Sequence, residues 1–86
     1  MPSSPVPLTE LPPGREAVIE AMGLDEREAL GLRAMGVAEG RPVVVLRRAP
    51  FGGPLHVRVG EAAFALDRSL AARVTVRPAE IGRAHV

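Results

Sequence analysis

The sequence predicts a mainly β protein: a small, partly closed β-barrel of about five strands. One α-helix should follow the first strand, and a short helical turn should precede the last. Two observations lead to this fold class. Short runs of alternating apolar and polar residues recur along the chain, separated by Gly- and Pro-rich turns. The 86 residues form one small domain, and a sheet of that size can cover its apolar face only by curling on itself.

Composition narrows the classes of function. Apolar residues make up 47% of the chain, yet it has two Phe and no Trp or Tyr, so it lacks aromatic platforms for stacking bases. The net charge of +1 also argues against nucleic acid as a partner. The absence of Cys excludes disulfides, thiol catalysis and cysteine-based metal sites. Without an apolar run of about 20 residues or a signal peptide, we expect a cytoplasmic protein that does not insert into membranes.

The domain is expected to span residues 8–78. Residues 1–7, with three Pro and two Ser, predict a disordered lead, after which Leu8 and Leu11 can pack against the domain. Residues 79–86 form a tail. Its last seven residues, EIGRAHV, match one reading frame of a common sequencing adapter, so we interpret them as translated adapter, with an ordinary disordered tail as the alternative.

The first strand is predicted at Arg15–Met22, where two sets of residues alternate between Gly14 and Gly23. A helix is predicted over Asp25–Met35, because Asp25 and Glu28 have the spacing of a capping box and Gly36 can end the helix in a left-handed conformation.

The apolar stripe of this helix should contain Ala29, Leu32 and Met35, with Leu30 beside them. Gly31 lies inside the helix at a cost of about 1 kcal/mol, so we expect it to permit close packing.

The strand Pro42–Arg48 should place Val43, Val45 and Arg47 on one face and the intervening residues on the other. A loop of residues 49–54 leads into Leu55–Val59, the cleanest alternation in the chain. Gly60-Glu61 fits a type II′ hairpin turn, after which Ala62, Phe64 and Leu66 should continue the inward face. Asp67 should cap a helical turn over residues 68–72, and the last strand, around Val74 and Val76, should end at Pro78.

The order of these segments resembles the FeoA family. The matching motifs are LxxLPPG at 8–14, LRAMGVAEG at 32–40, VVVLRRAPFGGPL at 43–55, VRVGEAAFAL at 57–66 and the closing RVTV at 73–76. The sequence departs from the family pattern at two places: Leu30-Gly31 replaces a frequent basic pair, and Gly53 replaces a frequent acidic or polar residue.

The resemblance implies an SH3-like β-barrel and a cytosolic accessory protein of bacterial ferrous iron uptake. Such a protein would dock on the cytoplasmic GTPase part of the FeoB transporter. The alternative is a metal-sensing regulatory domain related to the C-terminal barrel of DtxR-type repressors.

No residue pattern predicts catalysis, a resident cofactor or a metal site. His56 is the one His inside the domain and has no ligand-like spacing to an acidic residue, so we interpret it as an outward strand residue. Helix capping explains Asp25 and Glu28, and no Ser has a base at suitable spacing. The sequence leaves open weak association with iron and the oligomeric state.

A partner surface is the best candidate site. Arg47, Arg48 and Arg58 could form a basic patch or simply a solvated face. Phe51 lies in a loop bracketed by Pro and Gly, where it could plug the barrel end or anchor a partner. The candidate partner-binding residues are Arg47, Arg48, Pro50, Phe51, Gly53, Pro54 and Arg58.

Overall fold

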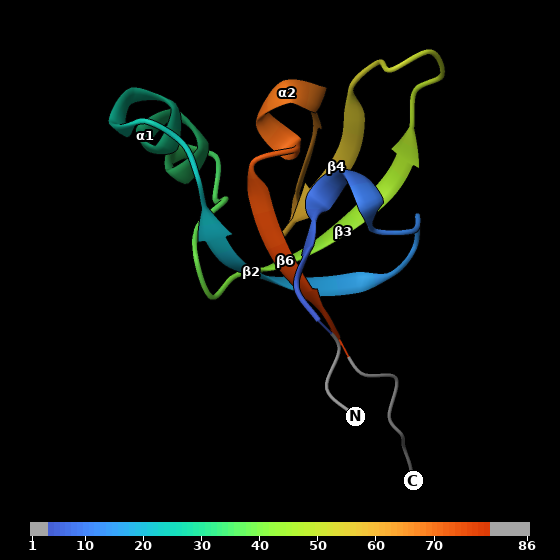
Figure 1. The fold of residues 1–86 in the computed structure, drawn as a ribbon, viewed down its shortest axis with the longest axis horizontal. Helices are drawn as coiled ribbons and strands as arrows, with labels where there is room; N and C mark the ends of the chain where they lie inside the picture. Colours follow the sequence, from blue (N-terminus) through green and yellow to red (C-terminus); the bar gives the residue numbers. More distant parts are fainter. Residues whose placement is uncertain (1–3, 80–86) are drawn as a thin grey trace, which may run out of the picture.

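The computed structural model describes residues 4–79, which form an antiparallel sheet, two short α-helices and one 3-10 helix (Figure 1). The strands are β1 (Val6–Pro7), β2 (Glu16–Met22), β3 (Pro42–Arg48), β4 (Leu55–Val59), β5 (Ala62–Leu66) and β6 (Val74–Pro78). The helices are η1 (Leu8–Glu10), α1 (Glu26–Ala34) and α2 (Arg68–Ala71). No helix within residues 4–79 is long and apolar enough to cross a membrane.

The sheet has the strand order β1-β6-β2-β3-β4-β5 and is not closed into a barrel. The expected closure is therefore corrected: β1 and β5 are the two edges and do not pair with each other. Between these edges, η1 contacts both α2 and β6 and covers the core without pairing to the backbone of β5. Leu8 of η1 and Ala71 of α2 are buried there, so side-chain packing takes the place of a last ladder of hydrogen bonds.

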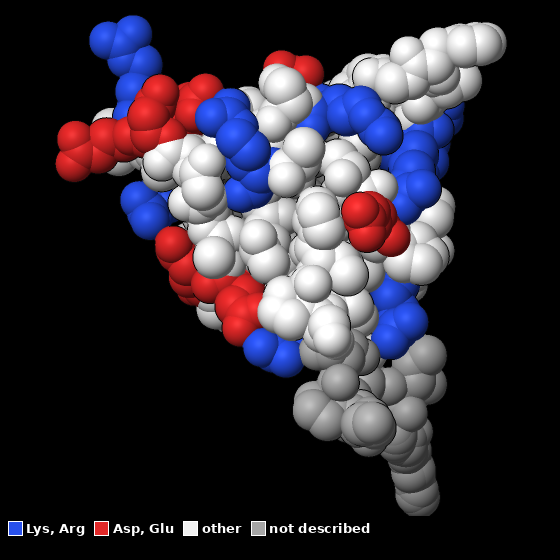
Figure 2. Space-filling model, viewed as in Figure 1, with Lys and Arg blue, Asp and Glu red and all other residues white. Residues whose placement is uncertain are grey.

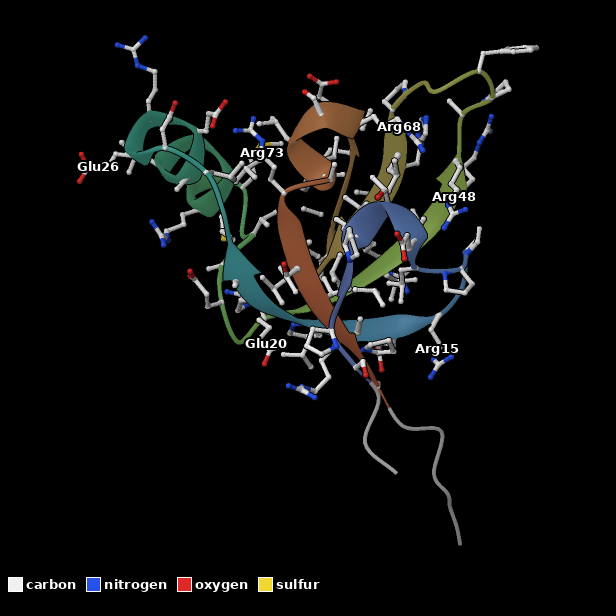
Figure 3. The ribbon with its side chains drawn as sticks, viewed as in Figure 1. Arg15, Glu20, Glu26, Arg48, Arg68 and Arg73 are labelled. Atoms are coloured by element: carbon white, nitrogen blue, oxygen red, sulfur yellow. The ribbon has the colours of Figure 1, made fainter. Side chains whose placement is uncertain are left out.

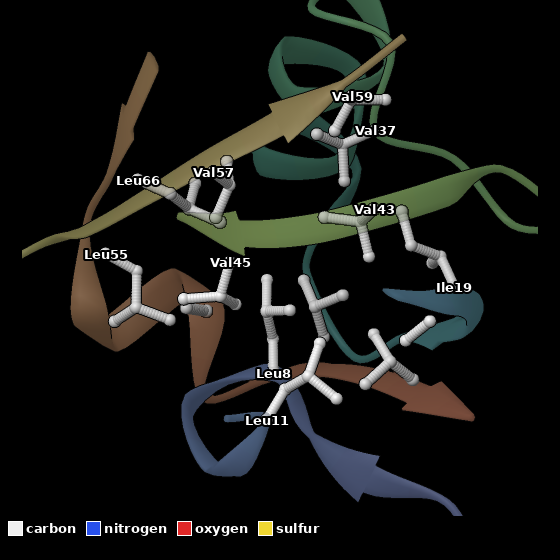
Figure 4. Packing of buried hydrophobic residues seen from close by; sticks show 14 of the residues in the cluster. Leu8, Leu11, Ile19, Val37, Val43, Val45, Leu55, Val57, Val59 and Leu66 are labelled. Carbon is white, nitrogen blue, oxygen red and sulfur yellow. The ribbon is translucent and has the colours of Figure 1, made fainter. Parts of the chain in front are cut away.

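One apolar cluster fills the concave side of the sheet (Figure 4). Its members are aliphatic and come from every strand from β2 to β6 and from the segments around η1 and α1. Leu8 and Leu11 lie opposite the strand residues in this cluster, which confirms that the segment before β2 packs against the domain. Two residues of the expected lead, Val6 and Pro7, form β1 and pair with Val76 and Thr75 of β6. Residues 80–86 of the expected tail lie outside the described residues.

A β-bulge in β3 corrects the predicted faces of this strand. The register with β4 shifts between Val45, which is opposite Val57, and Arg47, which is opposite His56. The additional residue, Leu46, moves the rest of the strand to the other face, as a one-residue slip must. Arg47 therefore lies on the outer face, and Arg48 lies on the inner face opposite Leu55.

A similar shift occurs in β2 between Ile19 and Ala21. Ala17 and Ile19 of one predicted set are buried, but after the bulge Ala21 of the same set is exposed and Met22 of the other set turns toward the core. The alternation predicted for residues 15–22 thus holds only for the first half of the strand.

Helix α1 begins and ends as the sequence predicts. Both hydrogen bonds of the capping box between Asp25 and Glu28 are present, at 2.8 and 3.2 Å. At the C-terminus, Gly36 has a φ of 97° and donates to the Arg33 carbonyl, while Val37 donates to the Leu32 carbonyl. These two bonds form a Schellman motif.

The packing predicted for this helix is partly wrong. Ala29 and Leu32 are buried, but Leu30 is 69% exposed and Met35 is 42% exposed, because α1 meets the sheet with a narrow stripe at one end (Figure 1). A Cβ on Gly31 would have no atom within 4 Å, so this glycine does not serve close packing.

The second half of the fold follows the prediction except at Asp67, which precedes α2 but whose side chain does not cap a backbone N–H of this helix. β4 and β5 have the predicted bounds and pair from Leu55 opposite Leu66 to Val59 opposite Ala62. Gly60 has the positive φ, 62°, that a type II′ turn requires at its first central position. Ala62 is nevertheless exposed, because it lies at the end of an edge strand.

Candidate functional site

The loop between β3 and β4, residues 49–54, projects away from the body of the domain (Figure 1). Its base closes through the Ala49 N–H, which donates to the Pro54 carbonyl at 3.0 Å. Its tip closes through the Gly53 N–H, which donates to the Pro50 carbonyl at 3.2 Å. Phe51 and Gly52 between them have φ values of 60° and 73°, as in a type I′ turn. Two backbone hydrogen bonds, one at the base and one at the tip, therefore fix the conformation of the loop.

Phe51 occupies the tip of this turn and is 103% exposed. Of the two predicted roles, plugging the barrel end is wrong for this loop, because the ring has no core contact. Phe51 is also the one non-glycine residue within 4–79 with a positive φ. For an L-residue this conformation costs about 1–2 kcal/mol, and an exposed apolar ring gains nothing in return from burial. Outliers of this kind occur preferentially at functional sites.

Gly53 holds the turn in shape through its missing side chain. A Cβ at this position would lie 2.8 Å from the Ala49 Cβ and 3.3 Å from the Pro50 carbonyl oxygen. The two arms of the loop therefore leave no room for a side chain at position 53. The missing side chain of Gly53 therefore contributes to the geometry that presents Phe51.

The three predicted arginines do not form one patch. Arg48 extends under the loop and donates to the Leu11 carbonyl at 2.8 Å, which ties β3 to the segment after η1. Arg47 and Arg58 lie on the outer face of the sheet, where Arg47 is opposite His56 and Arg58 is opposite Val44. Both side chains are exposed and have no hydrogen bond or ion pair with any other residue in 4–79.

Sequence reasoning missed a fourth arginine, Arg68. It is the first residue of α2, and its Cδ lies 3.9 Å from where a Cβ of Gly52 would be. Figure 3 shows Arg68 and Arg48 beneath the loop, from α2 and β3. The sequence carries no signal for this neighbourhood, because only the return of the chain through β5 brings α2 beside the loop.

Charge is unevenly distributed over the face in Figure 2. Basic side chains lie on both sides of this face, below the projecting loop and around α1, whereas most acidic ones lie on the side of α1, so the basic side chains below the loop have few acidic neighbours. The loop thus presents an apolar tip above a basic base, which suits a partner with an apolar pocket and an acidic rim.

The described residues do not provide a metal centre. No three His, Asp or Glu side chains within 4–79 gather closely enough to hold an ion. His56 is half-buried between Arg47 of β3 and Ala65 of β5 in the register of the sheet. An arginine as nearest cross-strand neighbour disfavours a bound cation.

Comparisons with known proteins give one consistent family. A family model described as FeoA domain matches residues 6–78. A crystal structure of the iron uptake regulatory protein FeoA is 33% identical, with a TM-score of 0.81 over 88% of this chain and 100% of that chain. FeoA from Stenotrophomonas maltophilia, solved with zinc and described as an SH3 domain protein, is 38% identical, with a TM-score of 0.68 over 80% of this chain and 86% of that chain.

A manganese-dependent transcriptional repressor shares the fold, with a TM-score of 0.80 over 90% of this chain and 43% of that chain. At 18% identity this likeness concerns the fold alone. The comparison with curated proteins gives no match.

Proposed function

Because the chain belongs to the FeoA family, a family of small accessory domains associated with ferrous iron transport, we propose that it docks on the cytoplasmic GTPase part of a FeoB-type transporter and promotes iron uptake. The proposal places the protein in the cytoplasm, as a partner of a membrane protein that does not itself insert into the bilayer. It assigns no catalytic residue to the chain.

The observation that supports docking most directly is the fully exposed Phe51 on its strained turn. A rigid aromatic loses little conformational entropy on binding and can fill a pocket in a partner. Pro50 and Pro54 stiffen the ends of the loop, and Gly53 fixes its tip, so the ring is pre-organised.

The arginines have separate roles in this proposal. Arg48 and Arg68 flank the loop, so they would meet acidic groups around the pocket that receives Phe51. Arg47 and Arg58 extend the basic surface to the outer face of the sheet. Rim charges of this kind mainly raise the association rate and make it dependent on salt.

Binding of the cognate FeoB cytoplasmic domain, measured by calorimetry, tests the proposal. Replacing Phe51 by Ala should weaken binding by tenfold or more, since a buried aromatic anchor contributes about 2 kcal/mol or more. The matched control is Leu30→Ala, which removes another exposed apolar side chain, on α1. No binding by the wild type, or equal effects of the two variants, would contradict the proposal.

The regulatory alternative rests on the fold shared with the manganese-dependent repressor. Calorimetric titration with ferrous iron distinguishes it. A stoichiometric micromolar site would favour metal sensing, while weak or absent binding fits an accessory role in which iron is the cargo of the transporter.

A further inference from the structure

Strand β5 (Ala62–Leu66) is an unprotected edge of the sheet. All five of its residues are apolar, and its pairing with β4 is regular, without a bulge. Natural edge strands are usually blunted by charges, by Pro, by bulges or by great shortness. The opposite edge obeys this rule, since β1 contains only Val6 and Pro7. β5 does not.

The backbone of β5 offers hydrogen bonds at two defined positions. The two-residue turn at Gly60-Glu61 joins Val59 and Ala62, which makes them a hydrogen-bonded pair. Such pairs alternate along an antiparallel ladder, so the N–H and C=O groups of Ala63 and Ala65 face away from β4. No other backbone group within residues 4–79 bonds to them.

The side chains of the same two residues leave the outer face open. Ala63 lies opposite Arg58 and Ala65 lies opposite His56. A strand added at the edge would be two strand spacings, roughly 10 Å, from β4. Because only the Ala63 methyl group stands between them, a long carboxylate side chain on such a strand could reach the Arg58 guanidinium. Arg58 has no ion pair or hydrogen bond with any other residue in the part of the chain described.

We propose that β5 binds an extended segment of a partner protein, which adds to the sheet as a further strand. The segment has alternating acidic and apolar residues. Its acidic residues lie beside Ala63 and Ala65 on the outer face and extend toward Arg58. Its apolar residues pack beside Phe64 on the inner face. This surface uses different backbone from the Phe51 loop, and the proposal holds whether or not that loop binds the transporter.

A second copy of the chain fits the edge less well. The two-fold register that satisfies both outward residues pairs Ala63 of one copy with Ala65 of the other. The same register places Glu61 opposite Asp67 at both ends of the pairing, and like charges directly opposite each other are destabilising. The charges therefore favour a different protein as occupant.

The test uses two synthetic peptides in which valine alternates with glutamate or with lysine. Each is titrated at low salt into isotopically labelled protein, and backbone amide shifts are recorded by NMR. The glutamate peptide should shift the amides of residues 62–66 and bind about tenfold more tightly than the lysine peptide. The Arg58→Glu variant should reverse this preference, while Arg27→Glu, the same change on α1, should not.

A proline substitution tests the hydrogen bonds. Ala65→Pro removes an N–H that faces solvent and leaves the ladder to β4 intact, so binding should fall about tenfold with the other amide resonances preserved. Ala63→Glu, which places a carboxylate beside Arg58 without proline, should abolish the preference for the glutamate peptide. Shifts located elsewhere, equal binding of both peptides, unchanged binding by these variants, or contacts between two copies through β5 would each overturn the proposal.

Discussion

The two hairpin connections of this sheet both reverse the direction of the chain, but they differ in which residue takes the positive φ. The β4–β5 turn uses two residues and places Gly60 where φ must be positive, so it has no strain, and the side chain that it exposes is the charged Glu61. The β3–β4 loop uses six residues and places Phe51 at a positive φ, although Gly52 and Gly53 follow directly. The first connection serves folding alone. The second accepts strain to expose an aromatic ring, which is why the proposed function is assigned to it.

The largest effect on stability should come from closing the space at Gly53. Gly53→Ala places a Cβ 2.8 Å from the Ala49 Cβ, so the arms of the loop must separate, at a cost of about 2 kcal/mol of unfolding free energy. Urea unfolding followed by circular dichroism measures this loss. Binding of the FeoB cytoplasmic domain should fall as well, because the turn that presents Phe51 is distorted. An unchanged unfolding midpoint would show that the loop is loose.

Gly60→Ala tests the β4–β5 turn, where only the positive φ of the backbone opposes a side chain. The nearest atom to a new Cβ is the Arg41 Nη2 at 3.7 Å, so the variant should lose only about 1 kcal/mol, from the positive φ. Gly31→Ala in α1 is the matched control. It has free space and a helical conformation, so the same change should raise the unfolding free energy by about 0.5–1 kcal/mol. Losses of equal size in both variants would contradict a conformational cause.

Phe51→Gly should raise stability while it weakens binding. Glycine adopts a φ of 60° freely, so the variant should gain up to about 1 kcal/mol, after allowance for the greater entropy of its unfolded chain. Phe51→Ala keeps the strain and should leave stability nearly unchanged. Both should weaken binding of the FeoB cytoplasmic domain equally. If Phe51→Gly were destabilised, the ring would have a structural role after all.

The sequence predicted most of the fold because each signal was local. The capping box at Asp25, the Schellman glycine Gly36 and the alternation of Leu55–Val59 depend on neighbours within a few residues, and the structure confirms all three. The bulge at Leu46 could not be predicted, because an inserted residue shows only in the register against β4. That one shift exchanged the faces of Arg47 and Arg48. Arg68 was missed for a similar reason, because its place beside the loop also depends on distant parts of the chain. The exposed Phe51 was anticipated as one of two alternatives, and only the three-dimensional path of the loop decided between them.

A third connection, between α1 and β3, adds a case in which side chains stabilise the turn. Arg33 and Glu39 form an ion pair of 3.3 Å across it. The backbone N–H of Glu39, and then the Arg33 guanidinium, lower the pKa of the Glu39 carboxyl. A lowered pKa of Glu39 stabilises the fold at pH values above the unfolded pKa of about 4.3, and this contribution disappears as pH falls through the lower folded pKa.

Because the side chains of Arg33 and Glu39 are both about half exposed, the effect of this ion pair on stability should be smaller than the effects of the glycine substitutions. Urea unfolding of Glu39→Gln should therefore show a slight loss near neutral pH that vanishes in acid. Glu61→Gln removes an exposed carboxylate that has no ion pair within residues 4–79, so it should cause no loss near neutral pH. A loss that persisted in strong acid would point to packing rather than charge as the role of Glu39.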